Sequence, residues 1–171
     1  MTAWIGLGSN LEDPAGQVCS ALLRLGEMES IEVVRTSGFY RTAPWGGVEQ
    51  GDFINAVTVI ETTFNPEHLL NTILEIEWEM GRERTGDRWG PRCIDLDLLT
   101  YNDMELQSPG LELPHPRMHL RAFVLAPVLE LDPDFRIPGL GPAQAQLELL
   151  ENQNVQRLGS AREFCNRMNT S

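Results

Sequence analysis

The feature that most constrains the fold is the order in which strand and helix patterns alternate along the first hundred residues. Helices are expected to begin at Asp13-Pro14 and Asn65-Pro66, where a capping side chain is followed by proline at the first helical position. Apolar residues at helical spacing extend them to about Gly26 and Gly81. β-branched, aromatic and alternating apolar residues predict strands over 2–7, 31–40, 53–61 and 94–101.

The resulting order, β-α-β-β-α-β, predicts an α+β fold. We expect a ferredoxin-like sandwich, with helices on one side of a mostly antiparallel sheet. The later sequence is less regular and predicts a short strand over 105–107 and helices over 121–129 and 143–150. With no internal repeat and no linker, residues 1–171 are expected to form one domain, and only the last dozen residues are expected to be disordered.

The charge pattern excludes several classes of function. The net charge is −12, which argues against binding to nucleic acid or to anionic membranes. All thirteen basic residues are arginine, so a P-loop or a Schiff base, both of which need lysine, is excluded. Six of the thirteen arginines lie between Arg82 and Arg121. Codon preference can explain the missing lysine but not this clustering, which indicates a local need for positive charge.

The N-terminus and the cysteines point to the cytoplasm. The first residues lack the basic start and apolar run of a signal peptide, and no stretch is long enough to span a membrane. Cys19, Cys93 and Cys165 are odd in number and far apart, so they are expected to be reduced thiols.

The strand that begins at Ile94 carries the first candidate site. Alternation along a strand puts Asp95 and Asp97 side by side on one face, and Ile94, Leu96 and Leu98 on the other. Two neighbouring carboxylates repel each other unless a cation lies between them, and Mg²⁺ binds one or two carboxylates together with phosphate oxygens. The alternative for this pair alone is a solvated strand face.

The sequence just before this strand favours phosphate as the partner. Arginine side chains match phosphate oxygens, and phosphoryl transfer needs both metal and cations. The residues concerned are Arg82, Arg84, Arg88, Trp89 and Arg92. Surface ion pairs with nearby acidic residues are the alternative for any one of these arginines. His115 and Arg121 form a second group that could reach the same phosphates.

Two further sets of residues suit a flat organic substrate. Gly6 and Gly8 permit close approach of the backbone at the end of the first strand. Aromatic side chains can stack on a planar ring, although each is more often part of a core. The aromatic candidates are Phe39, Trp45, Phe53 and Phe123.

Taken together, these motifs resemble the 6-hydroxymethyl-7,8-dihydropterin pyrophosphokinase family of folate biosynthesis. The resemblance covers nearly the whole chain, from Gly-Leu-Gly-Ser-Asn at 6–10 to Pro-His-Pro-Arg-Met-His-Leu-Arg-Ala-Phe at 114–123. Its most specific part is Arg-Trp-Gly-Pro-Arg-Cys-Ile-Asp-Leu-Asp at 88–97. The resemblance implies a ferredoxin-like fold, ATP as co-substrate, a pterin alcohol as acceptor and AMP as second product.

The resemblance also implies roles for individual residues. Asp95 and Asp97 would hold two magnesium ions and, with Arg82 and Arg92, form the catalytic set. The nucleotide would contact Glu77, Arg84, Arg88, Trp89, His115, Arg121 and the backbone from Ile94 to Leu98. The pterin would lie between Phe53 and Phe123, with Asn55 at its polar edge and Gly8, Thr42, Pro44 and Trp45 around it. Leu74, Gly110 and Glu112 depart from the polar or basic residues of some members, so the nucleotide contacts there are expected to differ.

Two other functions remain open from sequence alone. A ferredoxin-like binding module for RNA or a regulatory ligand is disfavoured by the charge and by the lack of an aromatic RNA-binding signature. A metal-dependent phosphohydrolase would use the same aspartates with water as nucleophile. We also expect the protein to be a monomer that acts on small molecules, without nucleic acid or membrane partners.

Overall fold

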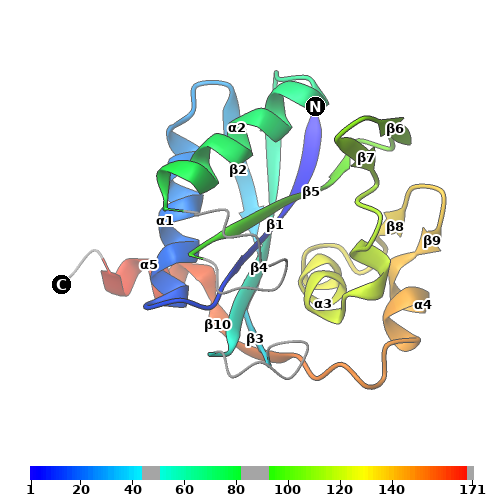
Figure 1. Ribbon diagram of the computed structural model, residues 1–171. Helices are drawn as coiled ribbons and strands as arrows, with labels where there is room; N and C mark the ends of the chain where they lie inside the picture. Colours follow the sequence, from blue (N-terminus) through cyan, green and yellow to red (C-terminus); the bar gives the residue numbers. More distant parts are fainter. Residues whose placement is uncertain (44–50, 82–92, 169–171) are drawn as a thin grey trace.

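The expected order of elements is present in the first part of the chain (Figure 1). A computed structural model describes residues 1–43, 51–81 and 93–168. Its first seven elements are β1 Thr2–Ser9, α1 Pro14–Glu27, β2 Ile31–Thr36, β3 Gly38–Thr42, β4 Phe53–Thr62, α2 Pro66–Glu79 and β5 Asp95–Tyr101. Both predicted helix starts are confirmed: Asp13 accepts a hydrogen bond from the Gly16 amide at 3.1 Å, and Asn65 accepts one from the His68 amide at 2.8 Å.

The central sheet has the strand order β10-β3-β4-β1-β5, in which β10 is Gln156–Ser160; β2 also pairs with β4, and all these pairs are antiparallel. Without β10, this is the ferredoxin-like arrangement that the element order predicts. The strand expected over 31–40 is divided at Ser37. The hydroxyl of Ser37 accepts from the Val57 amide of β4 at 3.0 Å and donates to the Gly38 carbonyl at 2.8 Å, so at this break a side-chain oxygen replaces a backbone carbonyl in the pairing with β4.

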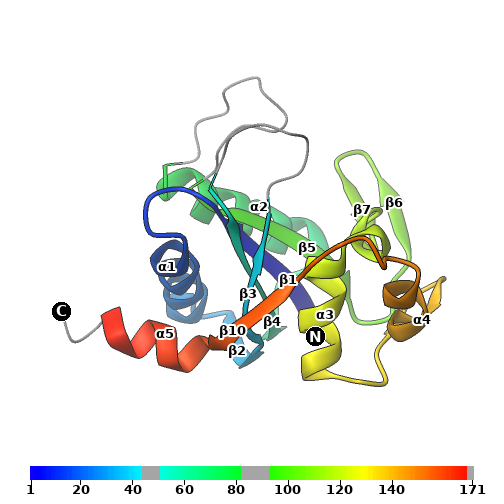
Figure 2. The ribbon, with the colours of Figure 1, turned by 90° about the horizontal axis from the view of Figure 1, so that it is seen from below.

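Helices cover both faces of the sheet, so the prediction of a one-sided sandwich is wrong (Figure 2). Helices α1, α2 and α5 (Ala161–Met168) lie on one face, whose core includes Ile5, Leu25 and Ile73. Helices α3 (Ala122–Leu131) and α4 (Ala143–Glu148) lie on the other. The reason is that Trp4, Val57, Val59 and Leu99 give the second face its own apolar cluster, which α3 and α4 bury.

Short elements connect the rest of the chain. They are β6 Leu106–Ser108, β7 Leu111–Leu113, the 3₁₀ helix η1 Met118–Leu120, β8 Arg136–Ile137, β9 Gly141–Pro142 and β10 Gln156–Ser160. The strand expected over 105–107 corresponds to β6, which pairs with β7 rather than with the central sheet. None of the helices that the structure describes is long and apolar enough to span a membrane.

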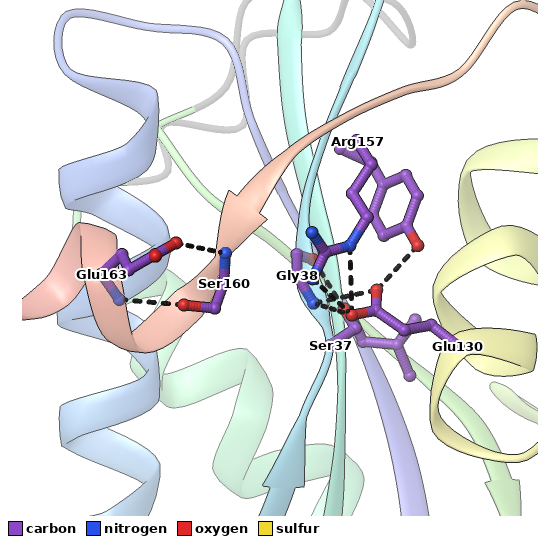
Figure 3. Close-up of polar contacts among 8 residues, drawn as sticks. Ser37, Gly38, Glu130, Arg157, Ser160 and Glu163 are labelled. Atoms are coloured by element: carbon purple, nitrogen blue, oxygen red, sulfur yellow. Dashed lines mark hydrogen bonds and ion pairs between the residues drawn. The ribbon is translucent and has the colours of Figure 1, made fainter.

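The C-terminal segment corrects two expectations. It is ordered through residue 168, because β10 pairs with β3 and α5 packs on α1. Ser160 and Glu163 form a reciprocal capping box at the start of α5, a local signal that could have predicted this helix (Figure 3). Cys19 on α1 and Cys165 on α5 form a disulfide, with Cα atoms 5.4 Å apart. The expectation of three reduced thiols is therefore wrong: 146 residues separate these two, so only the fold reveals the pairing.

Candidate active site

A cavity of about 800 Å³ opens on the α3 side of the sheet and continues around the edge strand β5. Glycine makes room for it. Gly6 and Gly8 on β1 lie directly opposite Asp97 and Asp95 on β5, and residues in such pairs share a face. A Cβ atom on Gly8 would come 3.0 Å from the Asn55 Oδ1 atom. The absence of side chains on β1 therefore leaves open space beside the two carboxylates.

The alternation predicted for β5 is confirmed. Ile94, Leu96 and Leu98 are buried in the core beneath α1 and α2, whereas Asp95 and Asp97 are partly exposed and line the cavity. Consecutive residues of one edge strand thus stabilise the fold and present carboxylate oxygens to the pocket.

Asp97 lies between two side chains from the segment after β7. Its Oδ2 atom accepts a hydrogen bond from Arg121 Nη1 at 2.7 Å, and its Oδ1 atom is 3.6 Å from His115 Nε2. All three side chains are at least two-thirds buried, with exposed fractions of 29% for Asp97, 20% for Arg121 and 15% for His115. An anion that enters the cavity therefore meets a cation and an imidazole already held beside the acidic pair.

Backbone geometry indicates the protonation state of His115. Its Nδ1 atom accepts a hydrogen bond from the Arg117 amide at 3.2 Å, so the proton of the neutral ring lies on Nε2, which faces Asp97. Burial lowers the pKa of His115; the charge of Asp97 raises it, but the charges of Arg121 and Arg117 lower it further. His115 is therefore a neutral hydrogen-bond donor at neutral pH.

The part of the cavity beyond β5 is apolar and suits a nucleotide base. Leu70 and Leu74 of α2 line it, and β5 pairs only with β1 among the described strands, so its other edge faces this region. The buried carboxylate of Glu77 accepts from the Leu96 amide at 2.6 Å and anchors that edge to α2. Gly110 and Glu112 also line the cavity.

The opposite part of the cavity is formed by β3, β4 and α3. The buried side chain of Asn55 donates through Nδ2 to the Thr42 hydroxyl at 3.0 Å, which fixes the orientation of its amide. Phe53 and Phe123 also line this part, and the Arg121 guanidinium lies 5.7 Å from the Phe123 ring centroid. Phe39 is not a stacking candidate: it is fully buried and packs on Phe164, with ring centroids 5.0 Å apart.

The structure brings most of the described candidates together. Those that line the cavity are Gly8, Thr42, Phe53, Asn55, Asp95, Asp97, Leu98, His115, Arg121 and Phe123. Ile94 and Glu77 are buried next to the cavity rather than in its wall. Seven candidates fall outside the described residues: Pro44, Trp45, Arg82, Arg84, Arg88, Trp89 and Arg92. Arg117, Leu120 and Val124 line the cavity but were not predicted, although Arg117 and Leu120 belong to the same motif as His115 and Arg121.

Comparisons with known proteins agree with this geometry. The family described as 7,8-dihydro-6-hydroxymethylpterin-pyrophosphokinase matches residues 4–133. A 2-amino-4-hydroxy-6-hydroxymethyldihydropteridine pyrophosphokinase of Methylorubrum extorquens is 41% identical over 156 residues, which are 91% of this chain and 98% of the relative. A protein of the same name from Haemophilus influenzae is 42% identical over 138 residues, covering 81% and 86%.

Solved structures support the fold independently of close sequence similarity. The crystal structure of Plasmodium falciparum HPPK-DHPS with pteroate superposes with a TM-score of 0.68 at 17% identity, over 86% of this chain and 42% of that one. The chain thus spans less than half the length of that plasmodial protein. From the sequence match, which covers most of its length, the chain belongs to the 7,8-dihydro-6-hydroxymethylpterin-pyrophosphokinase family.

Proposed function

We propose that this chain transfers diphosphate from ATP to the hydroxymethyl group of 6-hydroxymethyl-7,8-dihydropterin, giving AMP and the pterin diphosphate ester for folate biosynthesis. One observation carries the proposal. Across the sheet, Thr42 and Asn55 lie on one side of Asp95 and Asp97, and the apolar space near Leu74 lies on the other. A flat polar ring and a nucleotide can therefore occupy opposite ends of one cavity, with the phosphates at the aspartates.

The acidic pair fits magnesium. Asp95 and Asp97 present hard oxygen ligands on one strand face, beside two residues without side chains. A pair of carboxylates suits Mg²⁺, which completes its shell with water and substrate phosphates. Asp95 and Asp97 would hold two ions, whose positive charge would reduce the negative charge on the phosphates during transfer.

The side chains around the pair bind and orient the substrates. Arg121 and His115 would donate to phosphate oxygens, while Asn55 would read the polar edge of the pterin between Phe53 and Phe123. This would position the hydroxymethyl oxygen for in-line attack on the β-phosphorus, with AMP as the leaving group. Positioning and electrostatic stabilisation account for most of the acceleration in such reactions, so a dedicated general base is not required.

The same proposal includes residues outside the described part of the chain. Arg82, Arg84, Arg88 and Arg92 would contact the triphosphate with Trp89 near the nucleotide, and Pro44 and Trp45 would lie near the pterin. The support is the position of both segments in the chain: residues 44–50 join β3 to β4, and residues 82–92 lie between α2 and β5. All four of these elements border the cavity.

The decisive assay mixes purified protein, ATP, Mg²⁺ and the pterin alcohol, and measures AMP. We expect AMP to form in equal amount to the pterin diphosphate, and only when all three additions are present. Release of phosphate or diphosphate without pterin would instead identify a hydrolase, and the absence of any turnover would leave only a binding function. Either result would refute the proposal.

We further propose that the enzyme is a monomeric single domain that works in the cytoplasm, without nucleic acid or membrane partners. The net charge of −12 disfavours anionic partners, whereas the Cys19–Cys165 disulfide removes the cysteines as support for the cytoplasm. Light scattering that shows a mass other than 19.2 kDa would contradict the monomer.

A further inference from the structure

Helix α3 begins at the catalytic cavity but lacks a conventional cap. Its N-cap residue is Arg121, whose side chain has no hydrogen-bond acceptor and so cannot satisfy the first amides of the helix. The side chain of Gln153, thirty-two positions later, fills this role. Its Oε1 atom accepts from the Ala122 amide at 2.9 Å, and its Nε2 atom donates to the Leu120 carbonyl at 2.9 Å.

These two hydrogen bonds bracket Arg121. One amide side chain holds the backbone groups immediately before and after this residue, which fixes the direction in which its side chain leaves the backbone. That side chain forms the 2.7 Å contact with Asp97. Arginine has a long side chain with many rotamers. A fixed backbone therefore reduces the conformational entropy that Arg121 loses when it binds a phosphate.

Four positions after Gln153, Arg157 contacts the C-terminal end of α3 (Figure 3). Glu130, in the last turn, accepts hydrogen bonds from Arg157 Nη2 at 2.9 Å, the Tyr40 hydroxyl at 2.7 Å and the Gly38 amide at 3.0 Å. The spacing of the two contacts is consistent: four steps of extended chain span ~13 Å, and the eight helical steps from Ala122 to Glu130 span ~12 Å. Figure 2 shows this part of the chain crossing α3 on its way to β10.

We propose that Gln153 is a positioning residue for Arg121 in the pyrophosphokinase reaction. The segment from Gln153 to Arg157 then belongs to the active-site scaffold, although it lies beyond residues 4–133, which the family model matches. The expected effect of Gln153 on the reaction rate rests on the proposed function. Its structural basis, the bracket around Arg121, is independent of that function.

The test replaces Gln153 by methionine, which has similar length but forms neither hydrogen bond. We expect kcat/KM for ATP to fall about tenfold, the order of effect expected for two lost neutral hydrogen bonds, with little change in the KM for the pterin. The matched control is Gln144→Met. Gln144 is exposed on α4 and donates to Glu148 of the same helix, at 3.0 Å, so activity should be unchanged.

A double-mutant cycle separates positioning from general stability. In an Arg121→Ala background, Gln153→Met should change kcat/KM less than twofold, because the residue being positioned is gone. Equal effects in both backgrounds, or full activity in the single variant, would overturn the proposal. If Gln153→Met does not fold, Gln153→Asn, whose shorter side chain cannot reach both backbone groups, replaces it with the same expectations.

Hydrogen exchange gives a result that does not depend on catalysis. In Gln153→Met the Ala122 amide should lose protection while the amides inside α3 keep theirs. An Ala122 amide that stays protected would refute the bracket. Failure of the proposed function is recognised separately, because the unmodified protein would then make no AMP.

Discussion

The two faces of the central sheet differ in what the same strands carry. On the face under α1, α2 and α5, β1 and β5 contribute Ile5, Leu7 and Leu98 to a closed apolar core. On the opposite face the intervening positions hold glycine and aspartate, and a cavity replaces close packing. Because side chains alternate along a strand, a change at one position should affect chemistry, and a change at its neighbour should affect stability.

The largest effect is expected on the cavity face. Asp97→Ala should lower turnover by about three orders of magnitude, because it removes one of the two proposed magnesium ligands and leaves Arg121 and His115 without their common partner. The unfolding temperature should change little, since Asp97 is not part of the core. The AMP assay and thermal unfolding measure the two effects. Near-normal activity would remove the metal role from this residue.

The neighbouring face should respond in the opposite way. Ile5 is fully buried on β1, next to Gly6 in sequence but pointing into the other core. Ile5→Ala should lower the free energy of unfolding by about 2–5 kcal/mol, the cost of lost burial plus a cavity. Denaturant titration measures this loss, and kcat should be retained below the transition. A large fall in kcat with little loss of stability would break the proposed division between the faces.

The disulfide belongs to the closed face, since it joins α5 to α1 on that side. Cys165→Ser should lower the free energy of unfolding by about 2–4 kcal/mol, because the bond closes a long loop in the unfolded chain. Activity at moderate temperature should persist. A reducing agent should reproduce the effect in the original protein, whereas Cys93→Ser, outside this bond, serves as the control. Equal stability with and without reductant would contradict the prediction.

A smaller effect is expected when a side chain is added to the cavity face. The Cβ atom of Gly8→Ala would lie 3.0 Å from Asn55 Oδ1, so the amide must shift by a few tenths of an ångström. We expect the KM for the pterin to rise about tenfold, the order of one hydrogen bond, with kcat less affected. Gly26→Ala is the matched control, because its new Cβ would meet only Val33 at an ordinary 3.9 Å. An unchanged pterin KM in Gly8→Ala would contradict the assigned pocket.

Local signals in the sequence predicted the helix starts and the alternation along β5 well. Asp13 and Asn65 cap their helices through residues three positions away, and the alternation around Asp95 depends on a single strand, so both could be inferred without the fold. The motif around Arg121 indicated His115, and the resemblance to the family added Asn55; both line one cavity with Asp95.

The features that could not be predicted depend on distant contacts. The sequence does not show that the second face of the sheet is covered. That depends on contacts such as the one between Trp4 and Phe135, whose ring centroids lie 4.6 Å apart although 131 positions separate them. The pairing of Cys19 with Cys165 and the contact of Gln153 with Ala122 likewise join segments whose spacing carries no periodic signal. A pattern of local residues specifies elements, whereas tertiary packing decides which of them meet.

The smallest expected effect concerns how the cavity face is held at the far end of α3. Burial alone raises the pKa of Glu130, but hydrogen bonds from Arg157, Tyr40 and Gly38 outweigh it and lower that pKa below its ordinary value of 4.5. The folded protein therefore binds fewer protons than the unfolded chain. The stability from this carboxylate should be complete above about pH 4.5 and should be lost as the pH falls through the lower, folded-state pKa.

Glu130→Gln tests this by removing the titration. The variant should be less stable than the original protein at neutral pH, and the difference in free energy of unfolding should narrow as the solution is acidified. Denaturant titrations across the acidic range measure the difference. A gap that stays constant with pH would show that the Glu130 contacts hold α3 without depending on its charge. In that case the C-terminal end of α3 would be stabilised mainly by packing, as the core under α1, α2 and α5 is.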